Sequence, residues 1–407
     1  MGNDEILISG AGIAGPALAY WLRRGGFRVT VVERAPAPRP GGQTVDLRGA
    51  GRTVIERMGL MDRARAESVD QRGLALVDTS GRVTARMPAE SFGGEGIVSE
   101  IEILRGDLAR LLYEATLPDT EYLFDDTVTG IDEDADGVAV TFEKSAPRRF
   151  GLVVGADGPH SVVRTLAFGP EDACVRPLGL YTAWFTATVD DLDLDGWYLM
   201  HNAPGGLVAS ARPGREPGEI KAGLSFRSAP LTYDRRDVAA QRELVARRFA
   251  EVGWEAPRLV RAMRTAPDFF FDSMGQVRLD RWQRGRVALL GDAGYCATPL
   301  TGLGTSLALV GAYVLAGELS AARSSGRDHR VALRRYDEVM RPYVTQAQQL
   351  PPGGASGYAP SGRLGIRLRD LSMRSMTRWP MRQVLAAQFA KAGDIALPEY
   401  GPAARTR

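Results

Sequence analysis

The stretch "EILISGAGIAGPALAYWLRR" (residues 5–24) decides the fold of this chain. It opens with an apolar run that predicts a short buried strand, and it ends with the apolar spacing of a helix. The glycine-rich turn "GAGIAG" lies between them. The segment "RVTVVER" (residues 28–34) follows and alternates valine with other residues, which predicts a second strand. A strand, a helix and a strand in this order form a βαβ unit, which requires a parallel sheet.

The three glycines of this turn have separate physical roles. Gly10 permits the tight turn, Gly12 lets backbone amides approach a pyrophosphate, and Gly15 lets the helix pack on the strand. The helix N-terminus presents partial positive charge to the phosphates. Glu33 follows about 20 residues later, at the end of the second strand, where a carboxylate binds ribose hydroxyls. The unit predicts a dinucleotide site, with FAD or NAD favoured over NADP; a purely structural glycine turn is the alternative.

Two further apolar strands end on glycine and an acid. They run into "GADGPHSVVR" (residues 155–164) and "GDAGYCATPLTGLG" (residues 291–304). Parallel strands present their carboxyl ends at one edge of a sheet, which is the usual ligand edge. We therefore expect the three glycine-and-acid segments to meet, and one extended dinucleotide accounts for all of them better than three unrelated turns.

Composition excludes several classes of protein. The net charge of +2 over 407 residues does not favour a nucleic-acid partner, and three scattered histidines do not favour a metal centre. The two cysteines, Cys174 and Cys296, are far apart, which is typical of a reducing cytoplasm. No apolar run reaches the length of roughly 18 residues that spans a membrane. The helix expected from Thr305 comes closest, but it fits a buried core helix better.

The three motifs together carry a resemblance. "GAGIAG" with Glu33 and Arg34, "GADGPHSVVR" and "GDAGYCATPLTGLG" resemble the single-component FAD-dependent aromatic hydroxylases, the p-hydroxybenzoate hydroxylase fold, over about residues 1–320. The segment "GGQTVDLRGAG" (residues 41–51) is similar to the branch of tetracycline-inactivating and aromatic-polyketide monooxygenases. The resemblance implies non-covalent FAD, with NADPH or NADH as a transient reductant. It also implies oxygen transfer from a flavin C4a-hydroperoxide to a small aromatic or polycyclic substrate.

The resemblance also implies a set of cofactor contacts. Arg105, in "ILRGDL", would reach FAD, Val128 would offer a backbone contact to adenine, and Asp292 would bind the ribityl chain or a ribose hydroxyl. Arg105 as an exposed helix-start arginine and Asp157 as a turn cap stay open, and no catalytic side chain is identified because the flavin carries the chemistry. The full set is Gly10, Ala11, Gly12, Ala14, Gly15, Glu33, Arg34, Asp46, Arg48, Arg105, Val128, Asp157, Gly291, Asp292, Pro299, Gly302, Leu303 and Gly304.

A substrate pocket is expected over the flavin. The β-rich runs between residues 181 and 226 predict one antiparallel sheet that would cover it. Candidate lining residues are Phe92, Trp184, Met200 and Phe226, with Tyr295 as a pocket wall. Ordinary core packing is at least as good an explanation for each of these aromatic and apolar residues.

The third motif departs from the family pattern. Gly294 and Tyr295 stand where Ala-His is usual, Ser306 stands where Asn is usual, and Gly311 stands where Asp is usual. Functions of the backbone survive such changes, whereas side-chain contacts made from these positions come into doubt.

The sequence therefore predicts an α/β fold of three parts. A Rossmann-like FAD-binding domain with a parallel sheet comprises residues 1–72, 100–176 and 277–325. An antiparallel β-sheet substrate domain comprises residues 73–99 and 177–276, and a helical segment comprises residues 326–407. The expected protein is a cytoplasmic monooxygenase, a monomer or homodimer, without a transmembrane segment. Baeyer–Villiger insertion or another flavin reaction, and a flavin- or ligand-binding protein without turnover, remain alternatives.

Overall fold

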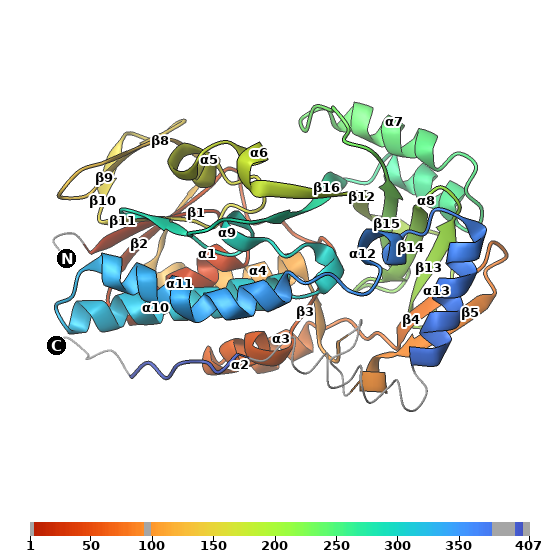
Figure 1. The fold of residues 1–407 in the computed structure, drawn as a ribbon, viewed down its shortest axis with the longest axis horizontal. Coiled ribbons are helices and arrows are strands. Elements are labelled where there is room, and N and C mark those ends of the chain that lie inside the picture. The colour runs from red at the N-terminus through yellow and green to blue at the C-terminus, as the bar shows by residue number, and fades with distance from the viewer. Residues whose placement is uncertain (1–3, 93–98, 377–394, 402–407) are drawn as a thin grey trace.

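The computed structural model describes residues 4–92, 99–376 and 395–401 (Figure 1). Its first layer is a six-stranded sheet in which all strands but the edge strand β17 run parallel. Near-continuous burial of β1 and β11 is what a parallel sheet covered on both faces requires. The strands, in spatial order, are β17 (Gln283–Arg284), β18 (Val287–Leu289), β11 (Leu152–Gly155), β1 (Glu5–Ser9), β2 (Arg28–Glu33) and β7 (Glu121–Phe124).

Helices cover one face of this sheet, and a small sheet lies over the other (Figure 1). On the first face α10 packs against α1, α2 and α11. On the second, α5 contacts β11 and β8. These elements are α1 (Ala14–Arg24), α2 (Gly49–Arg57), α3 (Met61–Ala66), α4 (Arg105–Glu114), α5 (Val162–Phe168), α9 (Asp292–Tyr295), α10 (Gly304–Ser324), α11 (His329–Ala347), and the strands β8 (Val128–Glu133), β9 (Val138–Phe142) and β10 (Arg148–Phe150).

Helix α10 is apolar on every side. Within the described ranges it is the one helix long and apolar enough to cross a membrane, and 83% of its apolar window is buried inside the protein. A helix that is apolar all round belongs in a core when other elements enclose it. The burial of α10 by α1, α2 and α11 thus accounts for its composition.

The second layer is a seven-stranded sheet, with only β13 and β4 paired parallel. Helices α7 and α8 cover one face, and α12 and α13 contact the other. The strands, in spatial order, are β16 (Phe270–Val277), β12 (Val175–Thr188), β15 (Glu219–Arg227), β14 (Leu207–Pro213), β13 (Trp197–Ala203), β4 (Gly73–Val77) and β5 (Val83–Pro88). The remaining elements are α6 (Glu171–Cys174), α7 (Val238–Arg248), α8 (Ala256–Met263), α12 (Gly354–Tyr358), α13 (Arg363–Met376), β3 (Thr44–Asp46), β6 (Glu102–Leu104), and the 3-10 turns η1 (Ala89–Phe92), η2 (Leu117–Asp119) and η3 (Pro299–Thr301).

The predicted fold class is confirmed, because a βαβ opening with a parallel sheet and a separate antiparallel sheet are both present. The short helix α12 forms within residues 349–362, a stretch rich in Pro, Gly and Ser inside the helical segment predicted for residues 326–407. The paired strands β4 and β5 join β12–β16 in one sheet. On that basis we propose to retain the three-part domain division.

Candidate active site

The three glycine-and-acid segments meet at the carboxyl edge of the parallel sheet, as the sequence predicted. Strands β1, β11 and β18 are neighbours and run in the same direction. Gly10 lies so close to the next strand end that a Cβ on it would stand 2.5 Å from the carbonyl oxygen of Ala156. A Cβ on Gly15 would stand 1.9 Å from the carbonyl oxygen of Gly10. Only glycine fits at either position, so the close approach of helix to strand depends on both.

Glu33 is held beside the glycine turn. Its Oε2 accepts a hydrogen bond from the Ala11 amide at 2.8 Å, and its Oε1 accepts one from the Ala35 amide at 2.9 Å. Helix α1 has no side-chain cap and no acidic residue in its first turn. Its N-terminal amides are therefore oriented toward the edge of the sheet with the partial positive charge that a phosphate requires.

Arg105 extends from the start of α4 across the same edge. Its Nη2 lies 3.3 Å from the position of a Cβ on Gly12. The side chain is exposed, yet the surrounding protein and Arg39 lower the pKa of Arg105, and the carboxyl groups of Asp292 and Glu33 oppose this. A side chain that is exposed to solvent and also has protein close by on several sides is typical of a residue that lines a cleft.

Asp292 begins α9 directly after Gly291, whose φ of 64° lies in the left-handed region. Burial raises the pKa of the Asp292 carboxyl, and the positive charge of Arg105 opposes the rise. A Cβ on Gly304, the first residue of α10, would lie 3.9 Å from Asp292 Oδ1. Helix α10 also has no side-chain cap and no acid in its first turn. The Asp292 carboxyl and the uncapped N-terminus of α10 thus lie next to one another.

The second motif is tied to the third. Asp157 accepts hydrogen bonds from Ser161 Oγ at 2.5 Å and from the Val162 amide at 2.9 Å, so it caps the start of α5. Arg164 is fully buried and donates to the carbonyl oxygens of Ala293 at 3.0 Å and Pro159 at 2.6 Å. Arg164 had no role in the sequence-based prediction, although it closes the quoted motif; here it fixes the two loops relative to one another.

The loop that precedes α2 reaches the start of α10. Arg48 and Asp46 form an ion pair at 2.5 Å. Gly302 has a φ of 65°, and a Cβ on it would lie 3.1 Å from Asp46 Oδ2. Ser306 Oγ donates to the Arg48 carbonyl oxygen at 3.1 Å. The structure therefore brings Asp46, Arg48, Gly302 and Leu303, which precedes α10, to one side of the site.

The remaining predicted cofactor residues lie on the periphery of this edge. Arg34 and Pro299 are exposed, and Ala14 is buried at the first position of α1. Val128 is buried at the start of β8. The Asp126 amide donates to the Glu33 carbonyl oxygen at 3.2 Å, which places the start of β8 beside the end of β2. These positions stay predictions of contact with the cofactor.

Sequence reasoning missed Glu102 and Arg212. Glu102 is 2% exposed on β6, directly opposite Asp46 of β3. Arg212 of β14 approaches Glu102 Oε2 at 3.2 Å, and its guanidinium lies 4.0 Å above the ring of Tyr198. Nothing in the local sequence around Arg212 signals this contact, because its partner is 110 residues away.

The predicted pocket residues separate into three places. Met200 and Trp184 belong to one face of the seven-stranded sheet, with Leu300 and Tyr358. Phe226 lies on the opposite face, under α7 and α8, because successive side chains of a strand point to opposite sides. The structure therefore does not bring Phe226 to the face of Trp184, and the side chain of Phe92 lies outside the described residues.

Tyr295 lies in the core of the first layer instead of on a pocket wall. It is fully buried against Trp282, and its hydroxyl is 2.8 Å from that of Tyr336. A Cβ on Gly311 would stand 2.1 Å from the Tyr295 hydroxyl oxygen. Two departures from the family pattern are thus one exchange: the tyrosine occupies the space that a side chain at position 311 would need.

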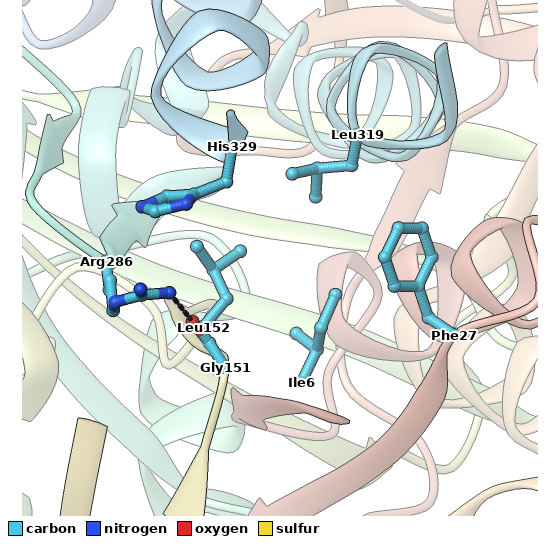
Figure 2. A pocket seen from close by; sticks show the side chains of 7 residues that line it. All are labelled: Ile6, Phe27, Gly151, Leu152, Arg286, Leu319 and His329. Atoms are coloured by element: carbon cyan, nitrogen blue, oxygen red, sulfur yellow. Dashed lines mark hydrogen bonds between the residues drawn. The ribbon is translucent and has the colours of Figure 1, made fainter. Parts of the chain in front are cut away.

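Figure 2 shows a cavity at the other end of the parallel sheet. It measures about 10 Å³, and Arg286 at its wall donates to the Gly151 carbonyl oxygen at 3.1 Å. Since one water needs about 10–15 Å³, this cavity holds no more than a water molecule. A second cavity of about 220 Å³ is lined by Pro177, Gly179, Leu180, Tyr181, Pro230 and Ser273. Neither cavity contains a residue of the carboxyl edge.

The residues at the carboxyl edge fit FAD. Glycines without Cβ atoms, the two uncapped helix N-termini, and Glu33, Arg105 and Asp292 match an extended molecule with pyrophosphate, sugar hydroxyls and a flat ring. In the described part of the chain, no group of three or more His, Cys, Asp or Glu side chains is arranged to hold a metal ion.

Comparisons with known proteins agree with this arrangement. A family model described as an FAD binding domain matches residues 3–350. The chain is 47% identical over 356 residues to the uncharacterized protein Rv1260 of Mycobacterium tuberculosis, covering 87% of this chain and 94% of that one. It is 35% identical over 399 residues to a flavin-dependent monooxygenase of Legionella longbeachae, covering 98% of each. The crystal structure of tetracycline destructase Tet(51) superposes with a TM-score of 0.80 at 33% identity, over 98% of this chain and 99% of that one.

Proposed function

Because the chain belongs to the FAD-binding-domain family of flavin-dependent monooxygenases, we propose that it hydroxylates a small aromatic or polycyclic molecule with NADPH or NADH and O2. The observation that carries the proposal is the meeting of two surfaces. The uncapped N-terminus of α10 lies next to Asp292 and Asp46, and Leu300, four residues before α10, packs on the sheet face of Trp184 and Met200. A flat ring at α10 would therefore face a surface suited to an aromatic substrate.

Each group at the site has a physical task in this proposal. FAD, when bound, supplies the electron transfer and oxygen activation that side chains cannot perform. Glu33 orients a ribose, the α1 amides bind the pyrophosphate, and Asp292 with Arg105 holds the sugar chain. The N-terminal amides of α10 stabilise negative charge beside the ring by about 0.3–2 kcal/mol. Trp184 and Met200 exclude water from the reacting atoms.

The likeness to tetracycline destructase Tet(51) supports a polycyclic, polyketide- or antibiotic-like substrate. Cys174 and Cys296 are both buried free thiols, which supports a cytoplasmic protein.

The direct test measures reductant oxidation and oxygen uptake. The purified protein should be yellow, and NADPH or NADH oxidation with oxygen uptake should increase when the correct tetracycline, phenol or aromatic polyketide is added. The product should gain the mass of one oxygen atom. A colourless protein after gentle purification, or one that no such compound stimulates, would contradict the proposal.

Asp292→Ala tests the cofactor role of one side chain. Loss of a hydrogen bond to a charged group costs about 1.5–3 kcal/mol, so FAD affinity should fall about 10- to 100-fold. Flavin fluorescence after dialysis measures the retained FAD. Asp136→Ala is the matched control, because Asp136 is exposed in the β8–β9 turn, where the Ala135 carbonyl oxygen accepts a hydrogen bond from Arg286 at the opposite end of β18. Equal FAD retention in the two variants would exclude the role given to Asp292.

A further inference from the structure

Two carboxyl groups face one another across a small sheet. Strands β3 and β6 pair antiparallel with Asp46 directly opposite Glu102. Like charges in this position repel and destabilise a sheet. The charge of Asp46 accordingly raises the pKa of the Glu102 carboxyl. A proton on one member removes one of the two like charges, and the protonated carboxyl can then donate a hydrogen bond to the other.

Each member of the carboxyl pair contacts an arginine. Arg48, which follows β3, contacts Asp46 at 2.5 Å, and Arg212 of β14 contacts Glu102 at 3.2 Å. Tyr198 of β13 stacks on the Arg212 guanidinium, and Thr44 of β3 also bonds to Arg212. With one proton on the pair the four charged side chains sum to +1, and with none they sum to zero.

Burial sets the pH range in which the pair exchanges its proton. Glu102 is 2% exposed, and this burial raises the pKa of Glu102 to about 7; the charge of Arg212 opposes the rise and that of Asp46 adds to it. A carboxyl with a pKa near the working pH is well suited to accept and return a proton.

The pair lies where the proposed ring and substrate meet. Asp46 Oδ2 lies 3.1 Å from the position of a Cβ on Gly302, two residues before α10. Arg212 belongs to the sheet that carries Trp184 and Met200. The Asp46 side chain is 14% exposed, whereas Glu102 lies behind it. Asp46 is therefore the member that a bound molecule can touch, and Glu102 is a positioning residue.

We propose that the Asp46–Glu102 pair accepts the proton of an acidic hydroxyl, a phenol or an enol, on the ring of the substrate. This inference rests on the proposed hydroxylation. The O–H bond of the hydroxyl breaks, its electron pair stays on the substrate oxygen, and the proton binds the ionised pair, where both carboxyl groups share it. The resulting phenolate or enolate is the more electron-rich ring, and Arg48 and Arg212 lie near its negative charge. No oxidant or reductant takes part in this step.

Infrared spectroscopy of the FAD-loaded protein tests the pair without substrate. A protonated carboxyl has a carbonyl stretch that an ionised one lacks. We expect such a band to disappear as the pH rises through about 7, and to be absent at neutral pH from Glu102→Gln and Asp46→Asn. Glu121→Gln is the control, because Glu121 lies on edge strand β7 and pairs with Arg148; it should keep the titration. A neutral-range band that survives in both pair variants, or is missing from the unmodified protein, overturns the proposal.

A phenol probe tests proton transfer itself. p-Nitrophenol bound to the unmodified protein should ionise at a lower pH than in water, seen as phenolate absorbance in a difference spectrum. Glu102→Gln should lose most of that shift while keeping FAD. If Glu102→Gln does not retain FAD, the same comparison with Asp46→Asn decides. Equal ionisation of the probe in protein and variant overturns the proposal. Failure of the hydroxylation hypothesis is distinguishable, because no compound would then stimulate reductant oxidation while the FAD-loaded protein still showed the infrared titration.

Discussion

The carboxyl edge of the parallel sheet and the junction around Asp46 and Glu102 are built in different ways. At the edge, backbone atoms of neighbouring strand ends approach so closely that a Cβ on Gly10 or Gly15 would overlap a carbonyl oxygen. At the junction, side chains from β3, β6 and β14 neutralise one another. The edge is therefore sensitive to volume, and the junction is sensitive to charge and pH.

This difference predicts how each region fails. A substitution at the edge should displace backbone, so stability and cofactor retention fall together. A substitution of a junction carboxyl with its amide keeps the volume and should change the pH dependence instead. Measurements that separate these two behaviours test whether the distinction is real.

Gly15→Ala should produce the largest effect. Its Cβ would stand 1.9 Å from the Gly10 carbonyl oxygen, so α1 or β1 must move. We expect a loss of about 3 kcal/mol in the free energy of unfolding, with release of FAD. Urea denaturation and flavin fluorescence measure the two effects. Gly362→Ala is the control, since no atom lies within 4 Å of its Cβ position. Retention of FAD by Gly15→Ala at control levels would refute the steric description of the edge.

A second, smaller effect lies beneath the same edge, where Gly311 and Tyr295 meet. Gly311→Ala should cost about 2 kcal/mol, because its Cβ would stand 2.1 Å from the Tyr295 hydroxyl oxygen. Tyr295→Phe removes that oxygen and should recover part of the loss in the double variant. Leu290, 2.9 Å from the same Cβ, prevents full recovery. A double-mutant cycle on thermal stability measures the coupling; strict additivity would show that the two residues are independent.

The two regions also differ in how far the sequence could predict them. Gly10, Gly12 and Glu33 belong to one βαβ unit, so local spacing alone predicts their roles. The contact between Arg212 and Glu102 joins residues 110 apart, and it exists only after both sheets have formed. No periodicity in β6 or β14 predicts the contact between Arg212 and Glu102.

The sequence also did not predict to which face of the sheet a strand residue points. Trp184 and Phe226 were predicted together, yet they point to opposite sides of the seven-stranded sheet. Successive side chains of a strand point to opposite faces of the sheet. Both faces of this sheet are covered, so hydrophobicity does not show which face meets the site. In the sequence, Tyr295 and Gly311 are two separate departures from the family pattern. Only the packing shows that the two residues depend on each other.

His160 joins the two layers at a third place and should give the smallest effect. It lies in the loop before α5, with Nε2 2.7 Å from Asp272 Oδ2 of β16 and Nδ1 3.1 Å from Glu171 Oε1 of α6. Burial lowers the pKa of His160, but the carboxylate of Asp272 outweighs this and leaves the pKa raised. A raised pKa in the folded state stabilises the fold below the unfolded value of 6.5, and the contribution is lost as pH rises through the folded value.

His160→Gln should therefore lower the free energy of unfolding by about 1 kcal/mol near pH 6 and by less near pH 8.5. Urea titrations at the two pH values measure the difference. Glu251→Gln, which removes an exposed carboxylate, should change stability by a similar small amount at both. If His160→Gln costs as much at the higher pH, the histidine joins the layers as a neutral hydrogen-bonding group. Charge sensitivity would then be confined to the junction around Asp46 and Glu102.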